Sequence, residues 1–200
     1  MGWQYPIPRK RREIFVRMAI RWIVYLTTIL MTGCPLPSFP EWDTGEEIEC
    51  GYNIKEKVCD LTLMNQNGDN WSLYGNLAEV TVIDLSVMWC APCQHAAEAS
   101  EDIVNYFGKD KVQWVTILIE DTQGNEPDLD DIQSWASTFH DSLPILAGNR
   151  GWIDLNGEYG FPLTSWPTFF IVDKDKNIRW ILQGWGEQTI RDLIENVLAK

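Results

Sequence analysis

Basic residues are scarce in this chain of 200 residues. Lys and Arg number 16 against 29 Asp and Glu, which gives a formal net charge of −13 at pH 7. Phosphate backbones are bound chiefly through Lys and Arg, so this balance argues against a nucleic-acid partner. Apolar residues make up 45% and charged residues 22%, which excludes collagen, coiled coil and long-range disorder. The length suits one domain, which can bury a core without disulfides.

The N-terminal apolar run, Trp22 to Met31, is too short for a membrane-spanning helix, which needs about 20 residues. It has the length of a signal-peptide apolar region, and it follows a basic stretch from Arg9 to Arg12. The small residues before Cys34 resemble the lipobox of bacterial lipoproteins. That resemblance implies cleavage before Cys34 and lipidation of this cysteine. We therefore interpret residues 1–33 as a lipoprotein signal peptide, with an uncleaved amphipathic anchor as the alternative.

The segment after Cys34 has little apolar periodicity. Three Pro and several acids stand between Pro35 and Glu49, a composition typical of a tether. We assign residues 34–58 to the tether and residues 59–200 to the folded domain. In lipoproteins an Asp directly after the lipidated cysteine often retains the protein at the inner membrane. Pro35 stands there, which favours the outer membrane if the source has two membranes.

Cysteine is limited to five residues, and only one C-x-x-C motif is present, formed by Cys90 and Cys93. If Cys34 carries lipid, Cys50 and Cys59 remain, and export to an oxidising compartment favours their pairing as a structural disulfide. Free or differently paired thiols are the alternative. A four-cysteine zinc site would need a second C-x-x-C. With only two His in the chain, we expect no metal and no cofactor.

Some segments alternate apolar and polar residues, others are continuously apolar, and others have apolar residues at helical spacing. Together these patterns predict an α/β fold with a central mixed sheet flanked by helices. Turn residues between residues 60–64 and 71–74 indicate an N-terminal β-hairpin. The further expected strands span residues 80–85, 112–119, 143–146, 168–172 and 178–182. The expected helices span residues 96–107, 128–139 and 188–199. We expect the first of these helices to begin at the C-x-x-C motif.

A buried strand that leads into Trp89-Cys90-Ala91-Pro92-Cys93 resembles the thioredoxin superfamily, and more closely its TlpA/ResA-like, redoxin-type lipoprotein branch. Asp84 stands where thioredoxins carry a buried acid, and Trp166-Pro167 matches the family's cis-proline. An N-terminal hairpin and an enlarged region between residues 121 and 164 are also typical of the extracytoplasmic branch. The resemblance covers about residues 59–200 and implies a thioredoxin-like fold.

Thiol–disulfide chemistry explains why these residues occur together. A helix N-terminus favours an anion, so Cys90 is expected to be the attacking thiolate and Cys93 the resolving cysteine. Burial should raise the pKa of Asp84 towards neutrality, where the carboxylate can accept the proton of Cys93. Its alternative role is that of a strand residue bonded to a backbone group.

The resemblance places Pro167 in cis opposite the cysteine pair. In the family, the backbone of the residue before this proline pairs with the substrate peptide. In this chain that residue is Trp166. We also expect Trp89 to be a surface aromatic beside the active site. Trp89 and Trp166 are therefore our candidate substrate-binding residues.

A peroxidase mechanism is disfavoured, because Ile83 and Val87 occupy the positions of Pro and Thr in the peroxiredoxin motif Pro-x-x-x-Thr/Ser-x-x-Cys. The resemblance instead implies a membrane-tethered, extracytoplasmic thiol–disulfide oxidoreductase that reduces exported proteins and receives electrons from a membrane partner. The alternative is a redox-silent lipoprotein that uses this fold as a binding or scaffold module. The residues alone leave the direction of electron flow and the substrate open.

Overall fold

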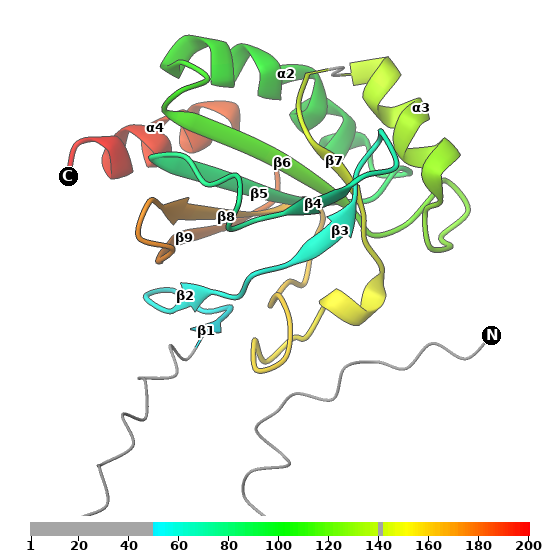
Figure 1. Ribbon diagram of the computed structural model, residues 1–200, viewed down its shortest axis with the longest axis horizontal. Helices are drawn as coiled ribbons and strands as arrows, with labels where there is room; N and C mark the ends of the chain where they lie inside the picture. Colours follow the sequence, from blue (N-terminus) through cyan, green and yellow to red (C-terminus); the bar gives the residue numbers. More distant parts are fainter. Residues whose placement is uncertain (1–49, 140–141) are drawn as a thin grey trace, which may run out of the picture. The chain divides into compact units, whose positions relative to one another are not determined.

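The computed structural model describes residues 50–139 and 142–200 (Figure 1). Cys34 and the predicted signal peptide lie outside these residues. No helix of the described part is both long and apolar enough to cross a bilayer. The elements of the main sheet and its helices are β5 (Val80–Ser86), α2 (Ala91–Phe107), β6 (Val112–Leu118), α3 (Leu129–Phe139), β7 (Ile145–Ala147), β8 (Thr168–Asp173), β9 (Ile178–Gln183) and α4 (Glu187–Leu198). The smaller elements are β1 (Cys50–Gly51), β2 (Lys57–Val58), β3 (Thr62–Met64), β4 (Asn70–Ser72) and the 3₁₀ turn η1 (Arg150–Trp152).

The main sheet has five strands in the order β7-β6-β5-β8-β9. β5, β6 and β7 run parallel, which requires crossover connections, and α2 and α3 supply them. β8 is antiparallel to β5, with Leu85 opposite Thr168, and β9 is antiparallel to β8. The predicted mixed sheet flanked by helices is confirmed. β5 is central and buried on both faces, and its apolar residues Val80, Val82, Ile83 and Leu85 are interspersed with the buried polar residues Thr81, Asp84 and Ser86.

The two faces of the sheet are covered by different elements. Val80 and Val82 of β5 pack in a cluster with buried residues of α2 and α4. Ile83 and Leu85, on the opposite face, pack in a second cluster that includes α3 and residues of the N-terminal segment. Figure 1 shows α2 and α4 on one side of the sheet and β3 and β4 on the other. The start of α2, with Cys90, Cys93 and Ala97, belongs to this second cluster, whereas Ala96, Ile103 and Val104 of α2 belong to the first.

The predicted hairpin forms between β3 and β4, with Leu63 opposite Trp71. Its turn reaches β7, since Gln66 donates to the carbonyl of Leu143 and accepts from the backbone N–H of Ile145. The hairpin thus closes over the edge of the main sheet.

The folded part begins earlier than the predicted domain boundary at residue 59. Residues 50–58, assigned above to the tether, form β1 and β2 and are closed by a disulfide between Cys50 and Cys59. They hydrogen-bond to the turn between β8 and β9 through the backbone of residues 55–58 and 176–178. Tyr52 also stacks edge-on against Phe161. We call residues 50–59 the N-terminal strap.

Candidate active site

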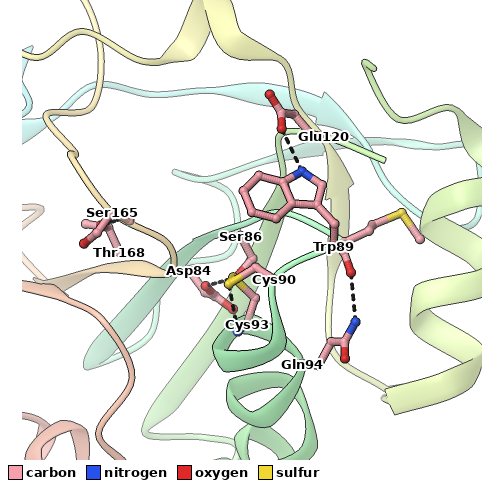
Figure 2. The surroundings of a disulfide bond; sticks show 10 residues. Asp84, Ser86, Trp89, Cys90, Cys93, Gln94, Glu120, Ser165 and Thr168 are labelled. Atoms are coloured by element: carbon pink, nitrogen blue, oxygen red, sulfur yellow. Dashed lines mark hydrogen bonds between the residues drawn. A yellow bond between two sulfur atoms is a disulfide. The ribbon is translucent and has the colours of Figure 1, made fainter. Parts of the chain in front are cut away.

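Cys90 and Cys93 lie where β5 ends and α2 begins. Cys90 is the N-cap of α2 with extended backbone angles, and its Sγ accepts the backbone N–H of Cys93 at 3.3 Å. The two sulfurs are joined in a disulfide (Figure 2). Pro92 occupies the first turn, where its missing N–H costs no helical hydrogen bond. The free N–H groups at this helix start would stabilise a thiolate on Cys90 in the reduced protein.

The two cysteines differ in access. Cys90 retains 6% of its surface exposed, whereas Cys93 is fully buried. Cys90 is therefore the more accessible residue of the two. This asymmetry agrees with an attacking Cys90 and a resolving Cys93.

Asp84 is fully buried in the middle of the sheet. It shares the face of β5 with Val80 and Val82, so its carboxyl points to the side covered by α2 and α4. Ser86 Oγ donates to its Oδ1 at 2.6 Å and Thr116 Oγ1 to its Oδ2 at 3.1 Å. Burial raises the pKa of Asp84 from 3.8 to about 7, although these hydrogen bonds act in the opposite direction. A carboxyl of this kind can hold or release a proton near neutral pH.

The peptide bond between Trp166 and Pro167 is cis. Pro167 directly precedes β8, whose first residue pairs with Leu85 near the end of β5, so this loop lies at the same edge of the sheet as the cysteine pair. The carbonyl of Pro167 accepts the backbone N–H of Gly184, and Thr168 Oγ1 donates to the carbonyl of Ser165. Trp166 is half-buried and packs against the core, so only part of its ring faces solvent.

Trp89 is half exposed, with 50% of its surface accessible, next to Cys90. Its indole Nε1 donates to Oε2 of Glu120 at 2.8 Å (Figure 2). The backbone carbonyl of Glu120 accepts the N–H of Met88. The second carboxylate oxygen of Glu120, Oε1, forms an ion pair with Arg150. Sequence reasoning missed Glu120 and Arg150. The one available signal for Glu120 was its position just after a buried strand, at the edge that holds the cysteines.

In the described part of the chain, no group of three or more His, Cys, Asp or Glu side chains is placed to hold a metal ion.

The model of the AhpC/TSA family matches residues 54–181. Comparison with curated proteins gives no match. Three solved structures illustrate the similarity of fold. A DsbF homologue from Corynebacterium diphtheriae is 17% identical, with 84% of this chain and 99% of that chain covered and a TM-score of 0.57. The exposed lipoprotein thioredoxin Etrx1 from Streptococcus pneumoniae is 20% identical, with 69% and 99% covered and a TM-score of 0.56. Peroxidoxin BcpB from Mycobacterium tuberculosis is 16% identical, with 74% and 97% covered and a TM-score of 0.57. These likenesses establish a thioredoxin-like fold.

The raised pKa of Asp84 predicts a specific pH dependence of stability. Well below pH 3.8 the carboxyl is protonated in both the folded and the unfolded chain, so its burial does not reduce the free energy of unfolding. Between pH 3.8 and about 7 only the unfolded chain ionises, and stability falls until the full cost is reached above pH 7. Asp84→Asn should therefore be more stable than the wild type by about 4 kcal/mol at pH 8 and by less than about 1 kcal/mol at pH 4.

Urea unfolding of the oxidised proteins between pH 4 and pH 9 measures this difference. Asp102→Asn, the same change on the exposed side of α2, is the matched control and should follow the wild type. Parallel pH curves for the wild type and Asp84→Asn would mean that Asp84 is already ionised in the folded protein.

Proposed function

This chain belongs to the AhpC/TSA family, and we propose that it is a membrane-tethered, extracytoplasmic thiol–disulfide oxidoreductase that reduces disulfides in exported proteins. The observation that carries the proposal is the cysteine pair at the start of α2, with an accessible Cys90 and a buried Cys93. A purely structural disulfide has no need of such asymmetry. Ile83 and Val87 occupy the places of the peroxiredoxin Pro and Thr, so a disulfide exchange mechanism is favoured over a peroxidase one.

The reaction starts from the reduced pair. The Cys90 thiolate attacks one sulfur of the substrate disulfide, which forms a mixed disulfide and releases the other substrate sulfur as a thiolate. Cys93 then loses its proton and attacks Sγ of Cys90. The Cys90–Cys93 disulfide forms, and the second substrate thiol leaves. Two electrons and two protons from a thiol donor, which we expect at the membrane, restore the dithiol.

Asp84 is our candidate for the group that accepts the proton of Cys93. Cys93 is buried, which disfavours its thiolate, and it needs a base close to its own pKa. Asp84 faces the side of the sheet that α2 covers, and its pKa of about 7 suits proton transfer at neutral pH. Cys90 needs no such help, because the helix N-terminus stabilises its thiolate.

Substrate contacts fall to the loops around Cys90. Trp89 offers an exposed aromatic surface beside the reactive sulfur. The backbone of Trp166, which precedes the cis-proline, is our candidate for pairing with an extended substrate segment. Because Trp166 packs partly into the core, its backbone is better suited to this role than its ring.

The cellular location rests on the N-terminal sequence. The basic stretch, the short apolar run and the small residues before Cys34 favour cleavage and lipidation at this cysteine. Residues 35–49 would then connect the lipid to the N-terminal strap. An oxidising compartment also suits the disulfide that closes the strap.

Replacement of the cysteines tests the exchange mechanism. Cys93→Ser cannot resolve the mixed disulfide and should accumulate a covalent adduct with insulin, whereas Cys90→Ser should form none. Non-reducing electrophoresis and mass spectrometry detect the adduct. The wild-type protein should reduce insulin with dithiothreitol as electron source; an inactive wild type would support the scaffold alternative.

Asp84→Asn tests the proton acceptor. It should slow release of substrate from the mixed disulfide by about 10²–10⁴-fold near pH 7, the usual size of general-base assistance. The first attack by Cys90 should keep its rate. Stopped-flow measurement of both steps between pH 6 and pH 9 separates them, and an unaltered release step would restrict Asp84 to a structural role.

Cys34→Ala tests the anchor. The variant should move from the membrane fraction to the soluble fraction, or remain as an unprocessed precursor, because the acyl chains supply the membrane affinity. Intact-mass analysis and fractionation measure both. Cys50→Ala is the matched control and should stay in the membrane fraction. An unchanged mass and distribution of Cys34→Ala would exclude lipidation.

A further inference from the structure

Glu120 joins three loops that surround the cysteine pair. Its backbone carbonyl holds the N–H of Met88, and its Oε2 accepts the indole N–H of Trp89. Its Oε1 pairs with Arg150 of η1, about 30 residues further along the chain. The loop before Cys90, the end of β6 and the region after β7 therefore meet at one side chain.

The carboxylate of Glu120 depends on Arg150 for its charge balance. The side chain of Glu120 is only 4% exposed, whereas that of Arg150 is 69% exposed. A buried carboxylate without a compensating charge is costly. Within residues 87–90, 119–128 and 148–167, which form the loops at this edge of the sheet, Arg150 is the sole Lys or Arg. No second cation of these loops can replace it.

We propose that Arg150 is a positioning residue of the dithiol site: it neutralises Glu120 and thereby holds the Trp89 ring beside Cys90. It touches neither sulfur and acts through Glu120 and Trp89. Figure 2 shows how the Trp89 ring extends from the loop before Cys90 to the Glu120 carboxylate. The role in turnover rests on the proposed function, but the geometry does not.

Loss of Arg150 has two consequences. The first is electrostatic, because an unpaired Glu120 carboxylate places a negative charge at the Trp89 ring, which is adjacent to Cys90 in the chain, and this charge opposes the effect of the helix N-terminus. The second is positional, because a carboxylate left without its cation draws water and releases the indole N–H that it accepts. Trp89 would then lose its fixed orientation beside the reactive sulfur.

Few other charged groups lie on the elements that surround Cys90. Asp84 lies on β5, Glu120 and the buried Asp121 follow β6, and Arg150 lies in η1 after β7. The carboxylate of Asp121 accepts N–H groups of Gln123 and Asn125 within its own loop. On α2 itself, His95 and Glu98 are exposed and pair with each other. The loop that contains Trp166 and Pro167 carries no ionisable side chain from residue 159 to residue 172 apart from Tyr159. Because Arg150 pairs with Glu120, we assign a change in the ionisation of Cys90 on removal of Arg150 to Glu120, and the double variant below tests this assignment.

Alkylation of Cys90 by iodoacetamide, followed by mass spectrometry from pH 5 to pH 9, is the primary test, because the thiolate is the reacting species. The full-length reduced protein is used. In Arg150→Met the midpoint should move to higher pH, with alkylation at pH 7 slowed by about threefold or more, as one nearby uncompensated charge implies. Arg150→Met combined with Glu120→Gln should return to the wild-type profile, since the charge is then gone.

Arg179→Met is the matched control. Arg179 also pairs with a nearly buried carboxylate, that of Asp173, but at the opposite end of the strands. The pH profile of Cys90 alkylation in Arg179→Met should superimpose on that of the wild type. The proposal is overturned if Arg150→Met superimposes as well, or if the double variant keeps the shift of Arg150→Met.

A second measurement tests the position of Trp89. After correction for the thiolate fraction, Arg150→Met should show a several-fold higher KM for insulin and an unchanged rate with a small aromatic disulfide. Equal effects on both substrates would overturn the positioning role. If the wild type fails to reduce insulin, the proposed function fails, yet the alkylation profiles still decide the role of Arg150, because they use no protein substrate.

Discussion

The parallel pairing of β5, β6 and β7 is the constraint on which the site depends. Parallel neighbours end at the same edge, so the loop before Cys90, the end of β6 and the region after β7 gather there. The antiparallel β8 begins where β5 ends, which brings the cis-proline to that edge as well. α2 starts at the same place and directs its free N–H groups towards Cys90. Residues from four separate parts of the chain thus gather at the edge of the sheet where Cys90 lies.

Two buried carboxylates of this site, those of Asp84 and Glu120, differ in the groups that bind them. Asp84 receives hydroxyl hydrogen bonds from Ser86 and Thr116, and burial raises its pKa to about 7. Glu120 receives an indole N–H and the charge of Arg150. Asp84 thus has neutral donors and no compensating cation, whereas Glu120 has a cation beside it. The first arrangement suits proton transfer, and the second suits fixed geometry.

The features that the sequence predicted are those set by local pattern. The apolar alternation of residues 80–85, the cysteine spacing and Asp84 all belong to one strand–turn–helix unit, whose geometry follows from short-range rules. The strands of the N-terminal strap were not predicted, because β1 and β2 have only two residues each. Backbone hydrogen bonds to residues 176–178, far away in the sequence, hold the strap in place. The pairing of Glu120 with Arg150 joins loops 30 residues apart, which no periodicity indicates. Cys34 lies outside the described residues and stays a prediction.

The N-terminal strap also determines how the folded unit carries a mechanical load. The chain enters it at Cys50, where the disulfide to Cys59 closes the loop covalently. Backbone hydrogen bonds then connect the strap to residues 176–178, at the end of β8 that lies farthest from Pro167. Tension applied through the N-terminal segment is therefore spread over a covalent loop and a short ladder of backbone bonds before it reaches the main sheet. The strap also contacts the region after β7, through Tyr52 on Phe161 and the amide of Asn53 on the carbonyl of Gly157, so part of this force reaches the loops at the edge that holds Cys90.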